Sequence, residues 1–233
     1  MSVAASTRAV VFDFDGVIAN SEPLHFLGFR DVLAEEGIAL SESEYYARYL
    51  GYDDAGAFFA VAADRGVSLA STLVVDLIRR KALRLEALDE QHSVLFPGAA
   101  DVIRRLSAHC PLAIASGAIR PAIERVLERG GLSAHFHTIV AAGETPMSKP
   151  APDPYERAVA LLSAAIGSPL TPGECVAIED SRWGLESAHA AGLRTIAVAH
   201  TYPAQALVAD AVVADLGALT WEFVCRVGRV RGE

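Results

Sequence analysis

The residues of this sequence with the clearest chemical potential are two aspartates, Asp13 and Asp15, which end a short apolar run and precede Gly16. Residues 10–12, Val-Val-Phe, are β-branched and aromatic, which is typical of a strand buried on both faces of a sheet. The two carboxylates therefore lie close together where a strand ends, whether or not Gly16 turns Asp15 away from the strand axis. An isolated pair of this kind is equally compatible with an ordinary turn, because Asp and Gly are common turn residues.

Other polar residues follow three later apolar runs that are expected to be strands. They are Ser116 and Gly117 after residues 112–115, Lys149 in the loop after 138–140, and Glu179 and Asp180 after 175–178. Alone, the serine suits a turn, the lysine a solvated surface and the acidic pair a helix cap. Ligands of an open parallel sheet bind where the strands end at their carboxyl side, so these groups are expected to meet Asp13 and Asp15 at one rim. The four carboxylates repel one another there, and one lysine does not offset all of their charge, so a cation is expected among them. Oxygen ligands of this kind suit Mg²⁺.

The elements that must position these residues form an alternating pattern from about residue 94 onward. The expected strands after the first are residues 112–115, 138–140, 175–178, 195–198 and 211–213. Helical patterns lie between them, which predicts an α/β fold with a Rossmann-like parallel sheet flanked by helices. One helix has a recognisable start, because Asp153 is placed to cap it and Pro154 suits its first turn.

Residues 21–93 differ from their surroundings because they look wholly helical and contain no β-like run. The helical patterns cover about residues 23–36, 42–50, 54–64 and 69–88. We therefore predict two domains: an α/β core of residues 1–20 and 94–233, and a small all-helical domain of residues 21–93 inserted after the first strand.

The composition excludes several classes of partner. The formal net charge is −9, the two lysines are Lys81 and Lys149, and there is no dense basic stripe, which argues against binding nucleic acid or an anionic membrane. No run approaches the length of a membrane span, and residues 1–8 lack the features of a signal peptide, so a cytoplasmic protein is expected. The three cysteines are scattered without a CxxC spacing, which favours core packing over a metal site or a disulfide.

Four motifs together resemble the haloacid dehalogenase superfamily. They read DFDGVIANSEPLH at 13–25, ASGA at 115–118, SKPAPDPY at 148–155 and IEDS at 178–181. Their order and spacing match that family over nearly the whole chain, in the branch with a helical cap inserted after the first motif. This branch includes proteins of the β-phosphoglucomutase and phosphoglycolate phosphatase type. The resemblance implies a Mg²⁺-dependent hydrolase that acts on a small phosphorylated metabolite through an aspartyl-phosphate intermediate.

The resemblance also implies a role for each motif residue. Asp13 would be the nucleophile, Asp15 the general acid and base, and Lys149 the bridge between the nucleophile and the phosphate. The groups that would hold phosphoryl oxygens are the Ser116 hydroxyl and the backbone N–H groups of Asp15, Gly16, Gly117 and Ala118. The Mg²⁺ ligands would be Asp13, the Asp15 carbonyl oxygen and Asp180, with Glu179 touching the ion directly or through water.

Two features of residues 21–93 leave alternatives open. His25, in the PLH part of the first motif, either lines the cleft near Asp15 or is merely packed within its helix. Four tyrosines of this segment either line its side of the cleft or pack between its helices, and packing is the favoured role. They are Tyr45, Tyr46, Tyr49 and Tyr52.

Departures from the family pattern narrow the expected reaction. Asp15 is present, whereas dehalogenases lack this second aspartate. Sugar phosphomutases carry a basic residue in a cap loop to hold a second phosphate, where this chain reads YLGYDDAGA at 49–57. Acidic residues there repel a phosphate, so a phosphatase is favoured. A β-phosphoglucomutase-like mutase is the alternative because Arg48 or Lys81 can substitute, and a non-catalytic binding protein that retains the fold is a second alternative.

Overall fold

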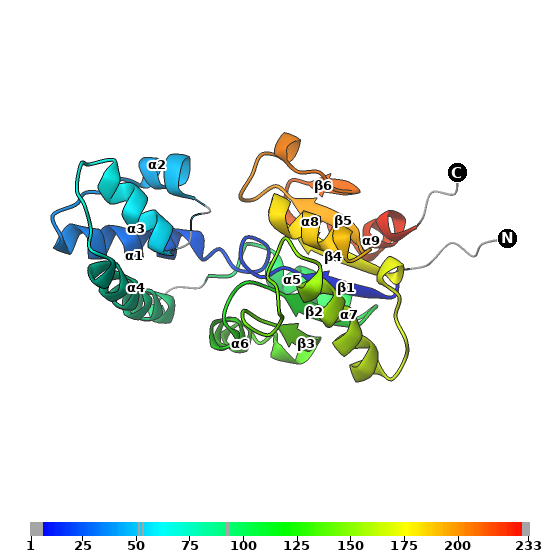
Figure 1. Ribbon diagram of the computed structural model, residues 1–233. Helices are drawn as coiled ribbons and strands as arrows, with labels where there is room; N and C mark the ends of the chain where they lie inside the picture. The colour runs from blue at the N-terminus through cyan, green and yellow to red at the C-terminus, as the bar shows by residue number, and fades with distance from the viewer. Residues whose placement is uncertain (1–6, 51, 53, 92–93, 230–233) are drawn as a thin grey trace. The chain divides into compact units, whose positions relative to one another are not determined.

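The structure, a computed structural model, describes residues 7–50, 52, 54–91 and 94–229 (Figure 1). The chain divides into two compact units, Met1–Asn20 with Leu95–Glu233 and Ser21–Val94. We refer to the first as the α/β unit and to the second as the helical unit.

The α/β unit is built on six parallel strands in the order β3-β2-β1-β4-β5-β6. The strands are β1 (Ala9–Phe12), β2 (Leu112–Ala115), β3 (Phe136–Val140), β4 (Cys175–Glu179), β5 (Arg194–Val198) and β6 (Ala211–Val213). This is the order of a doubly wound sheet, and it confirms the predicted Rossmann-like fold. The order reverses between β1 and β4, where Val10 pairs with Val176. Ligands bind such sheets beside this reversal, at the carboxyl ends of the strands.

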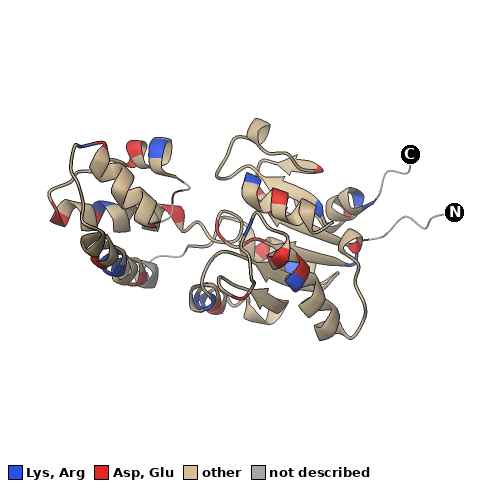
Figure 2. Cartoon of the chain, in the orientation of Figure 1, with Lys and Arg blue, Asp and Glu red and all other residues tan. Residues whose placement is uncertain are grey.

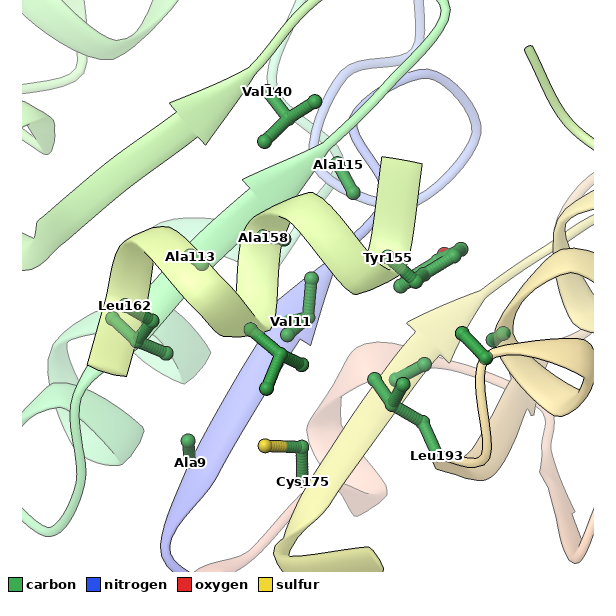
Figure 3. Packing of buried hydrophobic residues seen from close by; sticks show 14 of the residues in the cluster. Ala9, Val11, Ala113, Ala115, Val140, Tyr155, Ala158, Leu162, Cys175 and Leu193 are labelled. Atoms are coloured by element: carbon green, nitrogen blue, oxygen red, sulfur yellow. The ribbon is translucent and has the colours of Figure 1, made fainter. Parts of the chain in front are cut away.

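Helices surround the sheet in Figure 1. They are α5 (Ala99–Ser107), α6 (Arg120–Arg129), α7 (Asp153–Ile166), α8 (Arg182–Ala190) and α9 (Trp221–Gly228). Residues two apart on a strand share a face, so Ala9 and Val11 of β1 both point to the core that α7 covers with Ala158 and Leu162 (Figure 3). α7 packs mainly against β3 and β2 and also contacts β1.

The start of α7 differs from the sequence prediction. The helix begins at Asp153 with Pro152 in the capping position, and the Asp153 side chain makes no cap bond. Its Oδ1 instead accepts a hydrogen bond from the Met147 N–H at 3.3 Å. The Asp153 carboxylate therefore binds the loop that carries Lys149. The local sequence pattern does not distinguish this role from that of a helix cap.

The helical unit contains α1 (Glu22–Glu35), α2 (Glu42–Glu44), a π-helical turn (Tyr45–Tyr49), α3 (Asp54–Ala63) and α4 (Ser71–Gln91). The predicted helix over 42–50 is thus a short α-helix that continues as a wider turn. The unit has its own core, which includes Phe29, Phe58 and Leu77. Tyr45 and Tyr49 are buried in that core as expected, whereas Tyr46 and Tyr52 are exposed.

Positively and negatively charged residues are mixed over both units (Figure 2). On α4, for example, Arg80 pairs with Glu35 and Glu36, and Arg84 pairs with Asp31. Across the described ranges, no helix is both long and apolar enough to span a membrane.

Candidate active site

The predicted site residues of the α/β unit lie at the carboxyl ends of three neighbouring strands. Asp13 follows β1, Ser116 follows β2, and Glu179 and Asp180 end and follow β4. The Asp13 N–H donates to the Ile178 carbonyl at 2.9 Å, which extends the β1–β4 pairing to Asp13. The reversal of strand order thus brings Asp13 beside the acidic pair, although these residues are more than 160 positions apart in the sequence.

Lys149 joins two of these carboxylates. Its Nζ donates to Asp13 Oδ1 at 2.6 Å and to Glu179 Oε1 at 2.7 Å. Its side chain is 14% exposed, and the Nζ also lies 5.0 Å from the centre of the Tyr155 ring. A largely shielded lysine held between two carboxylates is a fixed positive charge at a fixed place.

Glu179 is fully buried and its two oxygens are both occupied. Oε1 accepts from Lys149 and from the Tyr155 hydroxyl at 3.2 Å, and Oε2 accepts from the Asp180 and Ser181 N–H groups and the Ser181 hydroxyl at 2.9 to 3.0 Å. A Cβ on Gly184 would lie 1.5 Å from Glu179 Oε1, so only glycine leaves room for this carboxylate. Five donors on one carboxylate indicate that Glu179 orients its neighbours.

Asp180 is 4% exposed and accepts a hydrogen bond from the Thr201 hydroxyl. Its Oδ2 packs against Gly16, where a Cβ would lie only 1.9 Å away. Gly16 has φ +81°, a left-handed conformation that favours glycine. The left-handed backbone and the close Asp180 side chain both require glycine at position 16. The turn after Asp15 therefore packs directly against Asp180, a candidate metal ligand.

The electrostatics of the cluster favour a bound cation. Burial, together with the carboxylates of Glu179 and Asp180, raises the pKa of Asp13 well above its usual value. Burial and the Glu179 charge raise the pKa of Asp180 to about 7. Burial alone would lower the pKa of Lys149, but the Asp13 and Glu179 charges raise it well above the usual value, so the lysine stays protonated.

Among the described residues, Asp13, Glu179 and Asp180 each offer an oxygen within 4.8 Å of the others. Three carboxylates around one lysine leave an excess of negative charge in a buried place. Hard oxygen donors of this kind fit a divalent cation such as Mg²⁺. The chemistry of these side chains therefore agrees with a metal site.

Asp15 lies in the turn that follows Asp13. It is half-buried and forms a backbone bridge with Ala19, and the Gly16 N–H donates to the Ala19 carbonyl at 2.8 Å. The turn thus closes on itself before the helical unit begins at Ser21.

Ser116 anchors the end of β2. Its N–H donates to the Val140 carbonyl at 2.9 Å, and its Oγ accepts from the Ala118 N–H at 3.0 Å. Beyond it, Arg120 binds both oxygens of Glu144 at 2.7 and 2.9 Å, which ties this loop to the loop after β3. The predicted phosphate-binding loop, residues 116–118, is therefore held from both sides.

His25 belongs to the helical unit. Its Nδ1 lies 3.1 Å from Lys81 Nζ, which also donates to Asp54 Oδ1 at 2.5 Å. Burial, and then the Lys81 charge, lowers the pKa of His25 to about 4. Packing against Lys81 accounts for the place of His25 within this unit, and its role in the active site stays a prediction.

Three residues that contact the cluster have no predicted role: Tyr155, Ser181 and Thr201. In the sequence, Tyr155 and Ser181 occur only as the last residues of two motifs, and Thr201 lies in no motif. Thr201 comes shortly after β5, so the strand-end argument used for the other residues would have found it. Tyr155 carried no such signal, because a buried tyrosine at helical spacing is usually part of a core.

Comparison with known proteins agrees with this geometry. Protein CbbY of Rhodobacter capsulatus is 32% identical over 206 residues, which cover 84% of this chain and 86% of CbbY. Fructose-1-phosphate phosphatase YqaB of Escherichia coli K12 is 28% identical over 198 residues, or 81% of this chain and 95% of YqaB. β-Phosphoglucomutase of Bacillus subtilis is 26% identical over 222 residues, or 93% of each chain.

The fold is also similar to a solved structure. A CbbY variant from Rhodobacter sphaeroides, crystallised with xylulose-1,5-bisphosphate, matches with a TM-score of 0.77 at 26% identity, covering 94% of this chain and 99% of that chain. Residues 7–192 match the model of a hydrolase family described as haloacid dehalogenase-like hydrolase. Carboxylates at the carboxyl ends of β1 and β4, a shared buried lysine and this match lead to one conclusion: the chain belongs to the haloacid dehalogenase-like hydrolases.

Proposed function

We propose that this hydrolase is a Mg²⁺-dependent phosphatase that removes phosphate from a small phosphomonoester through an aspartyl-phosphate intermediate. The observation that carries the proposal is the buried cluster in which Lys149 bridges Asp13 and Glu179. A loose phosphoryl-transfer transition state needs positioning and charge neutralisation more than it needs covalent chemistry from the protein. This cluster offers a nucleophile, a fixed cation and oxygen ligands for a metal in one place.

In the proposed first step, a carboxylate oxygen of Asp13 attacks phosphorus, and the bond from phosphorus to the leaving oxygen breaks. Asp15 donates a proton to that departing oxygen. In the second step Asp15 takes a proton from water, and the water oxygen attacks the aspartyl phosphate and releases inorganic phosphate and the Asp13 carboxylate. One carboxyl group thus serves as acid and then as base.

The phosphoryl oxygens are proposed to meet Lys149, the Ser116 hydroxyl and the Gly117 N–H. The Ser116 oxygen already accepts from the Ala118 N–H, which leaves its own hydrogen to donate to a phosphoryl oxygen. The Ala118 and Gly16 N–H groups, also expected to hold phosphate, would have to exchange their bonds to Ser116 and to the Ala19 carbonyl to do so. Donors fixed before the reaction stabilise the developing charge without reorganising.

Asp13, Asp180 and the Asp15 carbonyl oxygen would hold Mg²⁺ directly. The bound ion would neutralise charge on the phosphoryl group and on the two carboxylates. Since both Glu179 oxygens are engaged by protein donors, we propose that Glu179 acts on the metal site indirectly, by fixing Lys149 and the Asp180 backbone.

A sugar phosphate is the substrate class to test first. One relative is named a fructose-1-phosphate phosphatase, and a CbbY variant was crystallised with a sugar bisphosphate. The test measures inorganic phosphate released from sugar phosphates, phosphoglycolate and nucleotides in the presence of Mg²⁺. We expect release from small phosphomonoesters, its loss in Asp13→Asn, and wild-type rates in Asp101→Asn, a surface control on α5 whose side chain is 81% exposed.

Rapid quenching followed by mass spectrometry of peptides tests the intermediate, and we expect phosphate on the peptide that contains Asp13. An Asp13→Asn variant that releases phosphate at the wild-type rate would refute the assignment. Stable, folded protein that releases no phosphate from any compound would refute the phosphatase itself.

A sugar phosphomutase is the alternative, because a β-phosphoglucomutase is among the relatives. The two cations that would have to hold a second phosphate are both paired within the helical unit. Arg48 lies 2.6 Å from Asp64, and Lys81, 1% exposed, pairs with Asp54. We therefore expect hydrolysis of β-glucose 1-phosphate to exceed its conversion to the 6-phosphate in the presence of a bisphosphate primer, and faster conversion would favour the mutase.

A further inference from the structure

His200 is a side chain that no motif assigns and that lies beside the nucleophile turn. It follows β5 by two residues, and its Nδ1 lies 2.9 Å from the Gly16 carbonyl oxygen. A carbonyl oxygen only accepts hydrogen bonds, so Nδ1 carries a hydrogen and donates it. The His200 ring also stacks on Phe96, with ring centres 4.1 Å apart and planes 21° apart. One side chain therefore contacts two segments that are 80 residues apart in the sequence.

Both segments belong to the connection between the site and the inserted helices. Gly16 is in the turn that carries Asp15, and Phe96 lies where the chain returns to the α/β unit. The Phe96 N–H donates to the Ile18 carbonyl at 3.0 Å, and Ala19 forms an antiparallel bridge with Leu95. His200 thus links the outgoing turn, the returning segment and the end of β5.

Gly16 is the position of this turn where such a link has most effect. Glycine has the widest backbone freedom, and here it adopts φ +81° directly after Asp15. Its N–H is held by the Ala19 carbonyl, and its own carbonyl is held by His200. The two bonds together restrict rotation on both sides of the Gly16 Cα, so the peptide that joins Asp15 to Gly16 is restricted with it.

We propose that His200 is a positioning residue of the phosphoryl-transfer site, acting through Gly16 on the placement of Asp15. The inference rests on the proposed function, since it is the acid and base work of Asp15 that needs a fixed place. A reacting group displaced by about 1 Å can lose on the order of 10²-fold in rate. His200 itself touches neither the substrate nor the reacting atoms.

Two variants separate the hydrogen bond from the ring contact. His200→Asn keeps a side-chain N–H close to the position of Nδ1 but loses the stacking, and His200→Phe keeps a ring against Phe96 but loses the donor. A matched control is His109→Phe, because His109 stacks on Trp221 at the other end of the sheet, before β2. All three variants are assayed as the full chain with Mg²⁺, after thermal unfolding has established that each is folded.

We expect His200→Phe to lower kcat about 10-fold or more with little change in KM, and His200→Asn to stay within about 3-fold of the wild type. The loss in His200→Phe should be larger for an alkyl phosphate than for an aryl phosphate, because a good leaving group needs less help from Asp15. Equal losses on both substrates, equal losses in Asn and Phe variants, or a wild-type kcat in His200→Phe would overturn the proposal.

Hydrogen exchange gives a readout that needs no activity. The amides of Gly16, Ile18 and Ala19 are hydrogen-bonded within the turn. We expect them to exchange faster in His200→Phe than in the wild type, His200→Asn and His109→Phe. Unchanged exchange in His200→Phe would refute positioning by His200, whereas an absence of phosphate release by the wild type would refute the proposed function.

Discussion

Replacing Glu179 by Gln tests how much of the site's order depends on one buried carboxylate. The variant keeps the shape of the side chain but gives it an NH₂ group in place of one oxygen. If that group faces Lys149 and Tyr155, two buried donors lose their acceptor. If it faces the other way, the N–H groups of Asp180 and Ser181 lose theirs, whereas the Ser181 hydroxyl can rotate and accept from the new NH₂ group. A buried donor without a partner costs about 1–3 kcal/mol, so two donors predict a loss of about 2–6 kcal/mol in the free energy of unfolding.

Urea unfolding at neutral pH with a chelator present measures this loss without a contribution from bound metal. The two tryptophans, Trp183 and Trp221, both lie in the α/β unit, so their fluorescence reports on the unit that contains Glu179. Glu124→Gln is the matched control, because Glu124 pairs with Arg120 on the surface and should lose less than about 0.5 kcal/mol.

Tyr155→Phe provides an intermediate case, since it removes only the 3.2 Å bond to Glu179 and should lose about 1 kcal/mol. If Glu179→Gln unfolds within about 1 kcal/mol of the wild type, the reasoning from five buried donors is wrong.

Three further predictions concern chemistry and pH. Asp15→Asn cannot exchange a proton, so turnover of an alkyl phosphate should fall by about 10² or more while that of an aryl phosphate falls less, and equal falls would contradict the assigned role. Asp180→Ala should raise the Mg²⁺ concentration needed for half-maximal turnover. If the wild-type protein keeps its full turnover in excess chelator, the metal requirement is disproved. The third prediction concerns His25, whose pKa of about 4 is below the value near 6.5 of an unfolded chain. Because the unfolded state takes up a proton that the folded state does not, stability should fall as the pH drops from about 6.5 to 4. His25→Asn should show a smaller fall in urea unfolding followed by circular dichroism, and an identical fall would exclude His25 as the cause.

Local patterns were sufficient to predict the sheet and the residues at its rim. The β-branched and aliphatic run at 112–115 predicted β2 with the bounds observed, and the run at 211–213 did the same for β6. Once these strands are parallel, Asp13 and Asp180 must lie at the same edge of the sheet, where ligands bind. The observed order, with β1 beside β4, then makes them neighbours.

The contacts that refine the site were not predictable in the same way. The bond from Tyr155 to Glu179 and the packing of Asp180 on Gly16 depend on how α7 and the turn after β1 settle on the sheet. Asp153 shows the same limit, because a tertiary partner, the Met147 N–H, replaced the local cap. Spacing indicates which residues approach one another, and packing decides which atoms bond.

The central position of β1 has a consequence for how the protein is made. Val10 of β1 pairs with Val176 of β4, which is synthesised 166 positions later. At a translation rate of about 5–20 residues per second, about 8 to 33 s pass between the synthesis of β1 and that of its neighbour β4. During that wait the helical unit can complete its own core, because the cluster that includes Phe29, Phe58 and Leu77 is local in sequence. The inserted helical unit can thus fold during this interval, because its core does not depend on the sheet.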